Sequence, residues 1–139
     1  DVLQINAELL RLLLENGYLP VVSSLGADDE GQIFNINADT MAGAIAAALG
    51  AARLFLLTDV AGVLDKNGTL ISDLTPDKIA RLKSDGTITG GMLPKIDTCV
   101  SAVVGGAEAA VILDGRVAHV VLLEIFTQAG AGTLVRRAG

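Results

Sequence analysis

Residues 37–59, NADTMAGAIAAALGAARLFLLTD, place an expected helix directly before an expected buried strand. The first part is rich in alanine, offers Asp39 or Thr40 as the residue that caps the helix N-terminus, and ends at Gly50, a common helix stop. Residues 53–59 form a short apolar run that ends in polar residues, which is typical of a strand covered on both faces. The stretch therefore predicts a helix–strand unit of an α/β fold.

The same alternation continues on both sides of this unit. Upstream, we expect a helix ending at Gly17, a buried strand over YLPVVSS (residues 18–24) and a hairpin with its turn at residues 28–31. Downstream, we expect a hairpin turn at Asn67-Gly68, a helix from Pro76 capped by Thr75, a helix over residues 92–104 and a strand over residues 109–115. Residues 119–130 fit a helix or a strand, with the helix favoured, and residues 132–137 are expected to form a closing strand. The pattern predicts a single domain with a three-layer α/β/α sandwich and a mainly parallel sheet.

The composition excludes several classes of protein. The 139 residues suffice for one domain with a real core, and ten basic against sixteen acidic residues argue against a nucleic-acid partner. The longest apolar stretch, residues 41–57, is interrupted by Gly50 and Arg53, which argues against a membrane span. The single cysteine, Cys99, cannot form an internal disulfide and fits a buried small side chain in a reducing compartment. We expect a cytoplasmic protein.

The common catalytic motifs do not occur in the sequence. There is no G-x-x-x-x-G-K-[ST] phosphate loop, no G-x-G-x-x-G fingerprint and no G-x-S-x-G elbow. One cysteine and one histidine, His119, are too few for a Cys/His zinc site, and a lone histidine is more often structural than catalytic. Candidate chemistry must therefore come from the loops that follow the strands, where ligands bind in parallel sheets.

Two such loops carry polar residues. In NINADT (residues 35–40), Asn35 and Asn37 face one side of an extended segment, as a polar substrate site needs. In TDVAGVLD (residues 58–65), Gly62 can let the backbone approach a ligand, although a simple strand end and turn explains the segment equally well.

A third loop, GTITGGMLPK (residues 86–95), combines glycines, threonine hydroxyls and one lysine. The helix that begins at Met92 directs its positive end at the loop, which favours an anion there. Lys95 lies in the first turn of this helix, where the helix dipole disfavours a cation by a few tenths of a kcal/mol. An anion between the two would offset that cost, and phosphate is the natural candidate.

Five sequence blocks together resemble N-acetylglutamate kinases of the amino-acid kinase family. The resemblance spans nearly the whole chain and rests on GYLPVVSSLGADDEGQ (17–32), NINADT (35–40), LLTDVAGVLD (56–65), DGTITGGMLPK (85–95) and VLLEIFTQAGAGT (121–133). It implies a carbamate-kinase-like fold and transfer of the γ-phosphate of ATP, with Mg²⁺, to the side-chain carboxylate of N-acetyl-L-glutamate. A complete family member is roughly twice as long, so the resemblance implies that residues 1–139 are its C-terminal, ATP-binding domain without the N-terminal substrate domain.

The resemblance also implies a role for individual residues. Lys95 would stabilise the phosphoryl group, Asp39 would orient the catalytic lysines, and Asn35 would bind the amino-acid substrate. The second catalytic lysine of the family would belong to the N-terminal domain. The ATP-binding residues would be Asp59, Val60, Ala61, Gly62, Val63, Leu64, Thr87, Ile88 and Thr89. No protein ligand is assigned to the magnesium ion.

Other readings of the same residues stay open. The last block resembles the segment through which some members bind arginine, with Glu124 and Gly130 as contacts, but an amphipathic face with a glycine turn explains it as well. The chain could be a kinase for another carboxylate or a nucleotide monophosphate, a catalytically silent α/β scaffold, or an arginine-sensing module. The isolated chain is expected to bind nucleotide with little or no turnover, as a monomer or in an association unlike that of the family.

Overall fold

The computed structural model describes residues 2–128 and 130–137. Its helices are α1 (Ala7–Glu15), α2 (Ala38–Leu49), α3 (Pro76–Ser84), α4 (Met92–Gly105) and α5 (Val120–Phe126). Its strands are β1 (Leu25–Ala27), β2 (Ile33–Asn35), β3 (Leu54–Thr58), β4 (Asp73–Leu74), β5 (Ala109–Asp114) and β6 (Thr133–Arg136). Within the described residues, β1 and β2 form a hairpin, and the other strands form one sheet in the order β3-β5-β6-β4.

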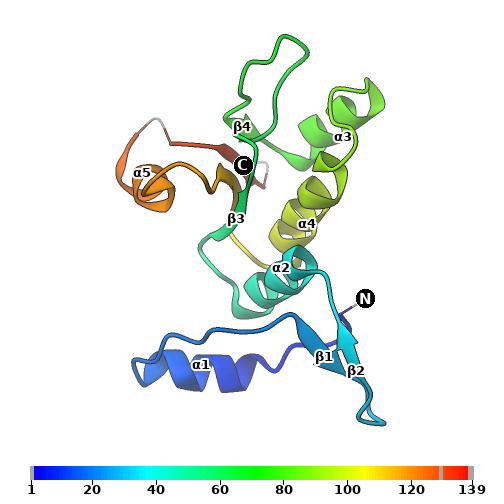
Figure 1. The fold of residues 1–139 in the computed structure, drawn as a ribbon, viewed down its shortest axis with the longest axis vertical. Coiled ribbons are helices and arrows are strands. Elements are labelled where there is room, and N and C mark those ends of the chain that lie inside the picture. The colour runs from blue at the N-terminus through cyan, green and yellow to red at the C-terminus, as the bar shows by residue number, and fades with distance from the viewer. Residues whose placement is uncertain (1, 129, 138–139) are drawn as a thin grey trace.

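Helices cover both faces of the four-stranded sheet (Figure 1). β3 pairs with β5 in parallel and β4 with β6 in parallel, whereas β5 and β6 are antiparallel. From β5, Ala110 and Ile112 face the layer of α2, α3 and α4, while Val111 and Leu113 face α5. Because side chains alternate along a strand, the buried run of β5 serves both layers. The predicted three-layer sandwich with a mainly parallel sheet is confirmed.

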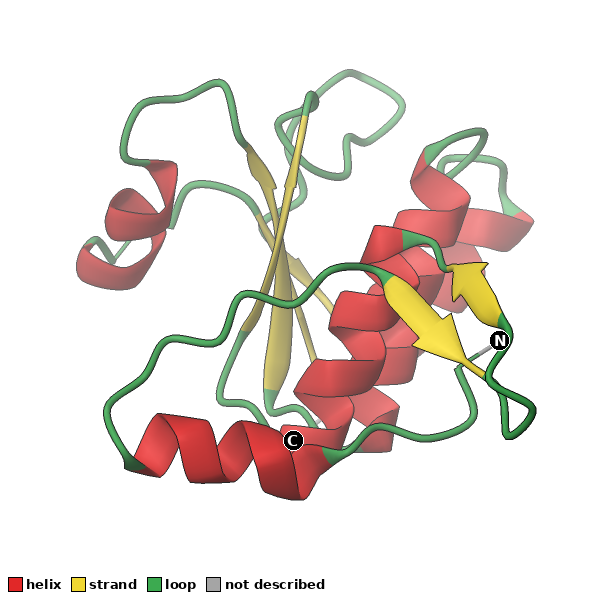
Figure 2. Ribbon diagram, turned by 60° about the horizontal axis from the view of Figure 1, so that its bottom comes forward, coloured by secondary structure: helices red, strands yellow, loops and turns green. Residues whose placement is uncertain are grey.

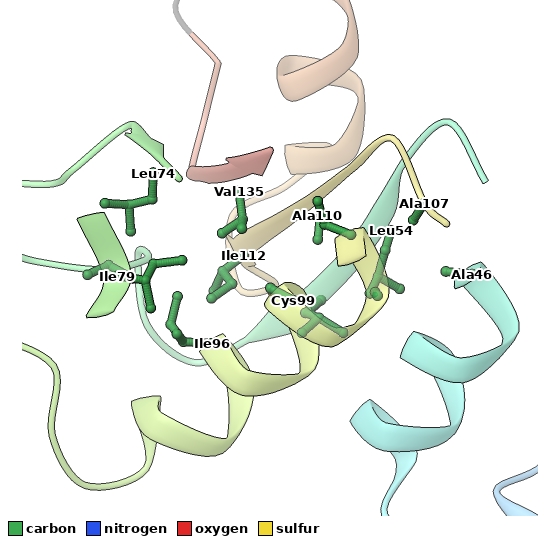
Figure 3. Packing of buried hydrophobic residues seen from close by; sticks show 14 of the residues in the cluster. Ala46, Leu54, Leu74, Ile79, Ile96, Cys99, Ala107, Ala110, Ile112 and Val135 are labelled. Atoms are coloured by element: carbon green, nitrogen blue, oxygen red, sulfur yellow. The ribbon is translucent and has the colours of Figure 1, made fainter. Parts of the chain in front are cut away.

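The larger of the two cores lies between the sheet and helices α2 to α4 (Figure 3). Ile96 and Cys99 project from α4 toward Ile112 in the centre of the sheet (Figure 3), and all three side chains are fully buried. The expectation that Cys99 is a small core side chain is therefore confirmed. Burial of such residues supplies most of the free energy that holds α4 on the sheet.

Residues 18–24 do not form the predicted strand. They are extended coil, and Leu19 and Val21 are 85% and 93% exposed. Within the described part of the chain, β1 and β2 pair only with each other, so no strand lies beside this run. An apolar run becomes a strand only where a neighbouring strand satisfies its backbone hydrogen bonds, which composition alone cannot reveal.

The remaining predicted elements are confirmed, with shifts of a few residues at some ends. The hairpin turn at residues 28–31 joins β1 to β2, and Thr75 caps α3. Of the helix expected over residues 119–130, residues 120–126 are helical, and residue 129 lies outside the described residues. Asn67-Gly68 lies at the tip of a short loop closed by one antiparallel bridge between Leu64 and Leu70. Figure 2 shows α1 and the β1–β2 hairpin beside α2 and outside the sheet.

None of the described helices has both the length and the apolar character needed to cross a membrane.

Candidate active site

Two helix N-termini and two strand C-termini meet at one end of the sandwich. α2 leads into β3 through residues 50–53, and α4 leads into β5 through residues 106–108. The N–H of Glu108 donates to the carbonyl of Ala51 (2.9 Å), so these two short connections lie side by side. Both helices therefore begin at the other end, where β3 and β5 finish. The carboxyl ends of parallel strands are the usual ligand-binding edge of such a sheet.

Helices α2 and α4 run parallel and very close together. A Cβ added to Gly43 would lie 2.8 Å from Cγ2 of Thr98, and one added to Gly106 would lie 2.7 Å from the carbonyl oxygen of Ala47. Gly43 precedes Ala47 along the chain, and their respective partners Thr98 and Gly106 follow in the same order. The two helices therefore run in the same direction. Their first turns are therefore neighbours, and each N-terminus carries the equivalent of about +0.5 charge.

Lys95 and Asp39 form an ion pair at this junction. Lys95 Nζ donates to Asp39 Oδ2 at 2.9 Å, and the two side chains are 24% and 31% exposed. The carboxylate of Asp39 can bind Lys95 because Asn37, and not Asp39, caps α2. Asn37 Oδ1 accepts the N–H of Thr40 at 3.1 Å. The expectation that Asp39 or Thr40 is the cap is therefore wrong, and the Oδ1 of Asn37 is engaged in capping rather than open to a ligand. The carboxylate of Asp39 also offsets the unfavourable position of a lysine in the first turn of α4.

Cys99 lies one turn after Lys95 and takes no part in this pair. Burial raises the pKa of its thiol to about 12; the charge of Asp39 raises the pKa further, and that of Lys95 lowers it. The thiol therefore stays protonated at neutral pH and cannot act as a nucleophile.

Asn35 is the last residue of β2, and it is exposed. It precedes the cap residue Asn37 by two positions, so it lies at the same end of α2 as Asp39. Within the described residues, no hydrogen bond engages its side-chain amide.

The glycine-rich loop before α4 turns sharply at two positions. Gly86 and Gly90 have φ angles of 75° and 55°, which L side chains rarely adopt. Ile88 between them is buried, and its N–H donates to the carbonyl of Leu82 (2.9 Å). Ile88 therefore anchors the loop to the core, while its neighbour Thr87 is half-buried and Thr89 is exposed.

The first amides of α4 are not an open anion site, contrary to the expectation. The N–H of Met92 donates to Thr89 (3.3 Å), that of Leu93 donates to Gly90 (3.2 Å), and Pro94 has no N–H. Positive potential at this end of α4 therefore rests on the helix dipole and on Lys95 rather than on vacant amides.

The segment of residues 59–64 leaves the end of β3 and is held by Thr133. Thr133 Oγ1 accepts the N–H of Val63 (2.8 Å) and donates to the carbonyl of Ile71 (2.7 Å). Gly62 has a φ of 142°, and a Cβ there would lie 2.5 Å from Thr133 Oγ1. Glycine is thus required at position 62 because the backbone there packs closely against Thr133, independently of any ligand. The exposed residues of the segment are Asp59, Val60, Ala61 and Leu64.

Replacing Thr133 by valine is expected to destabilise the domain by about 2 kcal/mol, because the buried N–H of Val63 loses its acceptor. Urea unfolding measures this loss. Thr69→Val is the matched control, since Thr69 is exposed and no hydrogen bond of its hydroxyl is seen in the described residues. Equal stability of both variants would contradict a structural role for the Thr133 hydroxyl.

Analysis of the sequence missed four charged residues around this segment. Arg116 donates to both carboxylate oxygens of Asp114 at the end of β5 (2.9 and 2.8 Å), and these hydrogen bonds lower the pKa of Asp114 to about 2. Lys66, two residues after the segment, has its Nζ 3.9 Å from Oδ1 of Asp85, the residue directly before the glycine-rich loop. Both aspartates begin an Asp-Gly-x turn, Asp114-Gly115-Arg116 and Asp85-Gly86-Thr87, and this repeated pattern was the available signal.

The candidate site is an open edge formed by charged groups. Two shallow hollows lie elsewhere, one along α1 and one between residues 2–5 and α2, and neither includes Lys95. Among residues 2–128 and 130–137, no three His, Cys, Asp or Glu side chains are grouped so as to hold a metal ion.

Residues 1–114 match the sequence pattern of the amino acid kinase family. The chain belongs to this family. Its curated relatives include acetylglutamate kinases: that of Erythrobacter litoralis is 64% identical over 132 residues, 95% of this chain and 44% of the relative. That of Novosphingobium aromaticivorans is 60% identical over 133 residues, 96% of this chain and 44% of the relative. The resemblance read from the sequence motifs is confirmed, and the chain spans less than half the length of these relatives.

Solved structures confirm the amino acid kinase fold. An N-acetylglutamate synthase from Neisseria gonorrhoeae, in complex with coenzyme A and N-acetylglutamate, has a TM-score of 0.92 at 27% identity and covers 99% of this chain and 32% of its own. Carbamate kinase from Giardia lamblia, bound to AMP-PNP, has a TM-score of 0.68 at 18% identity over 96% of this chain and 45% of its own. The second similarity concerns the fold alone.

The last block of this amino acid kinase chain contains a buried carboxylate. Glu124 in α5 is 8% exposed; its Oε2 accepts the N–H of Ala131 (2.6 Å), and its Oε1 lies 3.6 Å from a guanidinium nitrogen of Arg53. Gly130 has a φ of 67°, and a Cβ there would lie 2.9 Å from Glu124 Oε2. Glu124 and Gly130 are therefore in contact, and the carboxylate already pairs with one guanidinium from within the chain.

Proposed function

We propose that residues 1–139 form the ATP-binding domain of an acetylglutamate kinase, the enzyme that transfers the γ-phosphoryl group of ATP to the side-chain carboxylate of N-acetyl-L-glutamate. The observation that carries the proposal is the Lys95–Asp39 pair, placed where the N-termini of α2 and α4 meet. The 64% identity to an acetylglutamate kinase supports the same substrates.

In this mechanism, Lys95 neutralises charge on the phosphoryl group during transfer, while Asp39 fixes the position of Nζ. The positive ends of α2 and α4 add to the same field, which suits a phosphate group. The acceptor carboxylate has a pKa of about 4.3 and is already ionised at neutral pH, so the reaction needs no general base. Asp39 is thus an organiser of the lysine rather than a base. Mg²⁺, carried by the ATP phosphates, supplies further charge neutralisation.

The other site residues surround this centre. Asn35, exposed at the same end of α2, binds the amino-acid substrate. The segments 59–64 and 87–89 bind ATP. The contact between Lys66 and Asp85, two residues that flank these segments, supports a shared role. We further propose that the protein acts in the cytoplasm, and that this chain is a monomer or associates differently from the family.

Calorimetric titration of the purified chain with MgATP tests the proposal, and saturable binding at one site is expected. The chain alone is expected to phosphorylate N-acetyl-L-glutamate at least about a hundredfold more slowly than the Erythrobacter litoralis relative, because one lysine provides only part of the charge stabilisation. A cooperatively folded chain that binds no MgATP would refute the nucleotide assignment. Turnover equal to that of the relative would refute the expectation that this chain alone lacks part of the catalytic charge stabilisation.

Arginine binding near Glu124 is a second candidate function. The observation in its favour is that the buried carboxylate of Glu124 lies within ion-pair distance of the guanidinium of Arg53. A synthase from Neisseria gonorrhoeae that resembles this chain was solved in complex with L-arginine. Titration with L-arginine separates this function from nucleotide binding, and Glu124→Gln is expected to abolish any arginine signal while MgATP binding persists.

A further inference from the structure

The chain contains two Asn-Gly pairs, Asn16-Gly17 and Asn67-Gly68. Asparagine is chemically labile in such a pair, because the backbone nitrogen of the next residue can attack its side-chain amide carbon. Glycine has no side chain to hinder this approach, and its backbone is unusually free to move. The sequence alone makes both asparagines equal candidates for deamidation, whereas the structure treats them differently.

Asn16-Gly17 ends α1, and hydrogen bonds hold both reacting groups of this pair. The side-chain Nδ2 of Asn16 donates to the carbonyl of Leu12 at 2.8 Å, so the amide is tied to the last turn of the helix. The N–H of Gly17 donates to the carbonyl of Leu14 at 3.0 Å. Ring closure here requires both hydrogen bonds to break, which the folded end of α1 opposes.

Asn67-Gly68 lies at the exposed tip of the loop between β3 and β4, and this loop extends beyond the sheet (Figure 1). Asp65 holds the backbone of the tip. Its Oδ1 accepts the N–H groups of Asn67 and Thr69, both at 2.8 Å, and its carbonyl accepts the N–H of Gly68 at 3.0 Å. Among residues 2–128 and 130–137, no hydrogen bond engages the side-chain amide of Asn67.

The side-chain amide is therefore the group that distinguishes the two pairs. The glycine N–H is hydrogen-bonded at 3.0 Å in both, and both asparagines are exposed to water, so neither feature separates them. The amide of Asn67 can rotate until its Cγ approaches the nitrogen of Gly68. The amide of Asn16 must first leave its carbonyl partner in α1.

We propose that Asn67 is a site of spontaneous deamidation in the folded chain and that Asn16 is protected. The backbone nitrogen of Gly68, once it has lost its proton to hydroxide, attacks Cγ of Asn67. A C–N bond forms and the Cγ–Nδ2 bond breaks; Nδ2 takes up a proton from water and leaves as ammonia. Water then opens the resulting succinimide ring at either carbonyl, which gives aspartate or isoaspartate. The net change is loss of ammonia and gain of water, and it needs no oxidant and no cofactor.

The products change the loop in charge and in length. A new carboxylate lies directly beside Lys66, whose Nζ is 3.9 Å from Asp85 Oδ1, and it competes with Asp85 for that cation. Isoaspartate also adds a methylene group to the main chain after residue 67, which displaces the N–H of Thr69 from Asp65. Deamidation at Asn67 is independent of nucleotide binding, and the more acidic product can be separated by ion exchange.

Incubation of the purified chain at mildly alkaline pH, followed by proteolysis at acid pH and mass spectrometry, tests the proposal. In the folded chain, residue 67 is expected to convert at least about fivefold faster than residue 16, the factor that one ordinary hydrogen bond supplies. In denaturing guanidinium chloride, both asparagines lose their hydrogen bonds and are expected to convert at similar rates. A folded chain in which residue 67 stays intact, or converts no faster than residue 16, would overturn the proposal.

Substitutions at the two glycines identify the attacking nitrogen. Gly68→Ala is expected to suppress conversion of residue 67, because a methyl group hinders the nitrogen, and to leave the rate at residue 16 unchanged. Gly17→Ala is the matched control: the two glycines have φ angles of 80° and 79°, and a Cβ at either would meet nothing within 4 Å. It is expected to leave conversion of residue 67 unchanged. Undiminished conversion of residue 67 in Gly68→Ala would overturn the proposed attack.

Discussion

Replacing Lys95 by alanine is expected to weaken MgATP binding by roughly 10- to 100-fold, the range for loss of a hydrogen bond to a charged group. Two effects act in the same direction. The cation that faces the phosphates is removed, and the carboxylate of Asp39, normally paired at 2.9 Å, is left to repel them. The measurement is a calorimetric titration at fixed ionic strength, because salt screens such contacts.

Lys78→Ala is the matched control for this substitution. Lys78 also lies in the first turn of a helix and also faces an aspartate, Asp73, at 3.9 Å, but it belongs to α3 and is largely exposed. It is expected to bind MgATP as the unsubstituted chain does. If Lys95→Ala folds cooperatively and keeps full affinity, the phosphates do not lie at the junction of α2 and α4, and the role assigned to Lys95 is wrong.

Local sequence signals account for most of the helices and strands. Pro76 after Thr75, Gly50 after an alanine-rich run, and the apolar run of β5 each depend on interactions within a few residues. The cap of α2 could also be read locally, but NINADT offers four candidate cap residues, and only the geometry selects Asn37. Residues 18–24 had to be misassigned, because a strand depends on a partner that the run itself does not encode.

The geometry of the candidate site was harder to predict from the sequence than the helices and strands were. Lys95 and Asp39 are 56 positions apart, and their contact depends on the parallel packing of α2 on α4. The resemblance to a known family named both residues but could not supply that geometry. The hydrogen bonds of Thr87 to Asp85 are different, since they span two residues and follow from an Asp-Gly-Thr turn. That pattern could have been read from the sequence.

Replacing Gly106 by alanine is expected to cost about 4 kcal/mol of folding free energy, the sum of backbone strain and overpacking. Gly106 caps the C-terminus of α4 with a φ of 143°, and an added Cβ would lie 2.7 Å from the carbonyl oxygen of Ala47. Because that oxygen belongs to the backbone of α2, no side-chain rotation relieves the clash and the helices must separate. Urea unfolding measures the loss.

Gly50→Ala is the comparison variant that lacks the close helix contact. Gly50 caps α2 as Gly106 caps α4 and also has a positive φ, 62°, but a Cβ there would meet nothing within 4 Å. It is expected to cost only the strain of a left-handed alanine, about 1 kcal/mol. A difference near 3 kcal/mol between the two variants would reflect the tight packing of α2 on α4 together with the larger strain of an alanine at a φ of 143°. Equal losses of folding free energy would mean that α2 and α4 can separate at little energetic cost. The close packing of the two helices could then not be what holds Asp39 against Lys95.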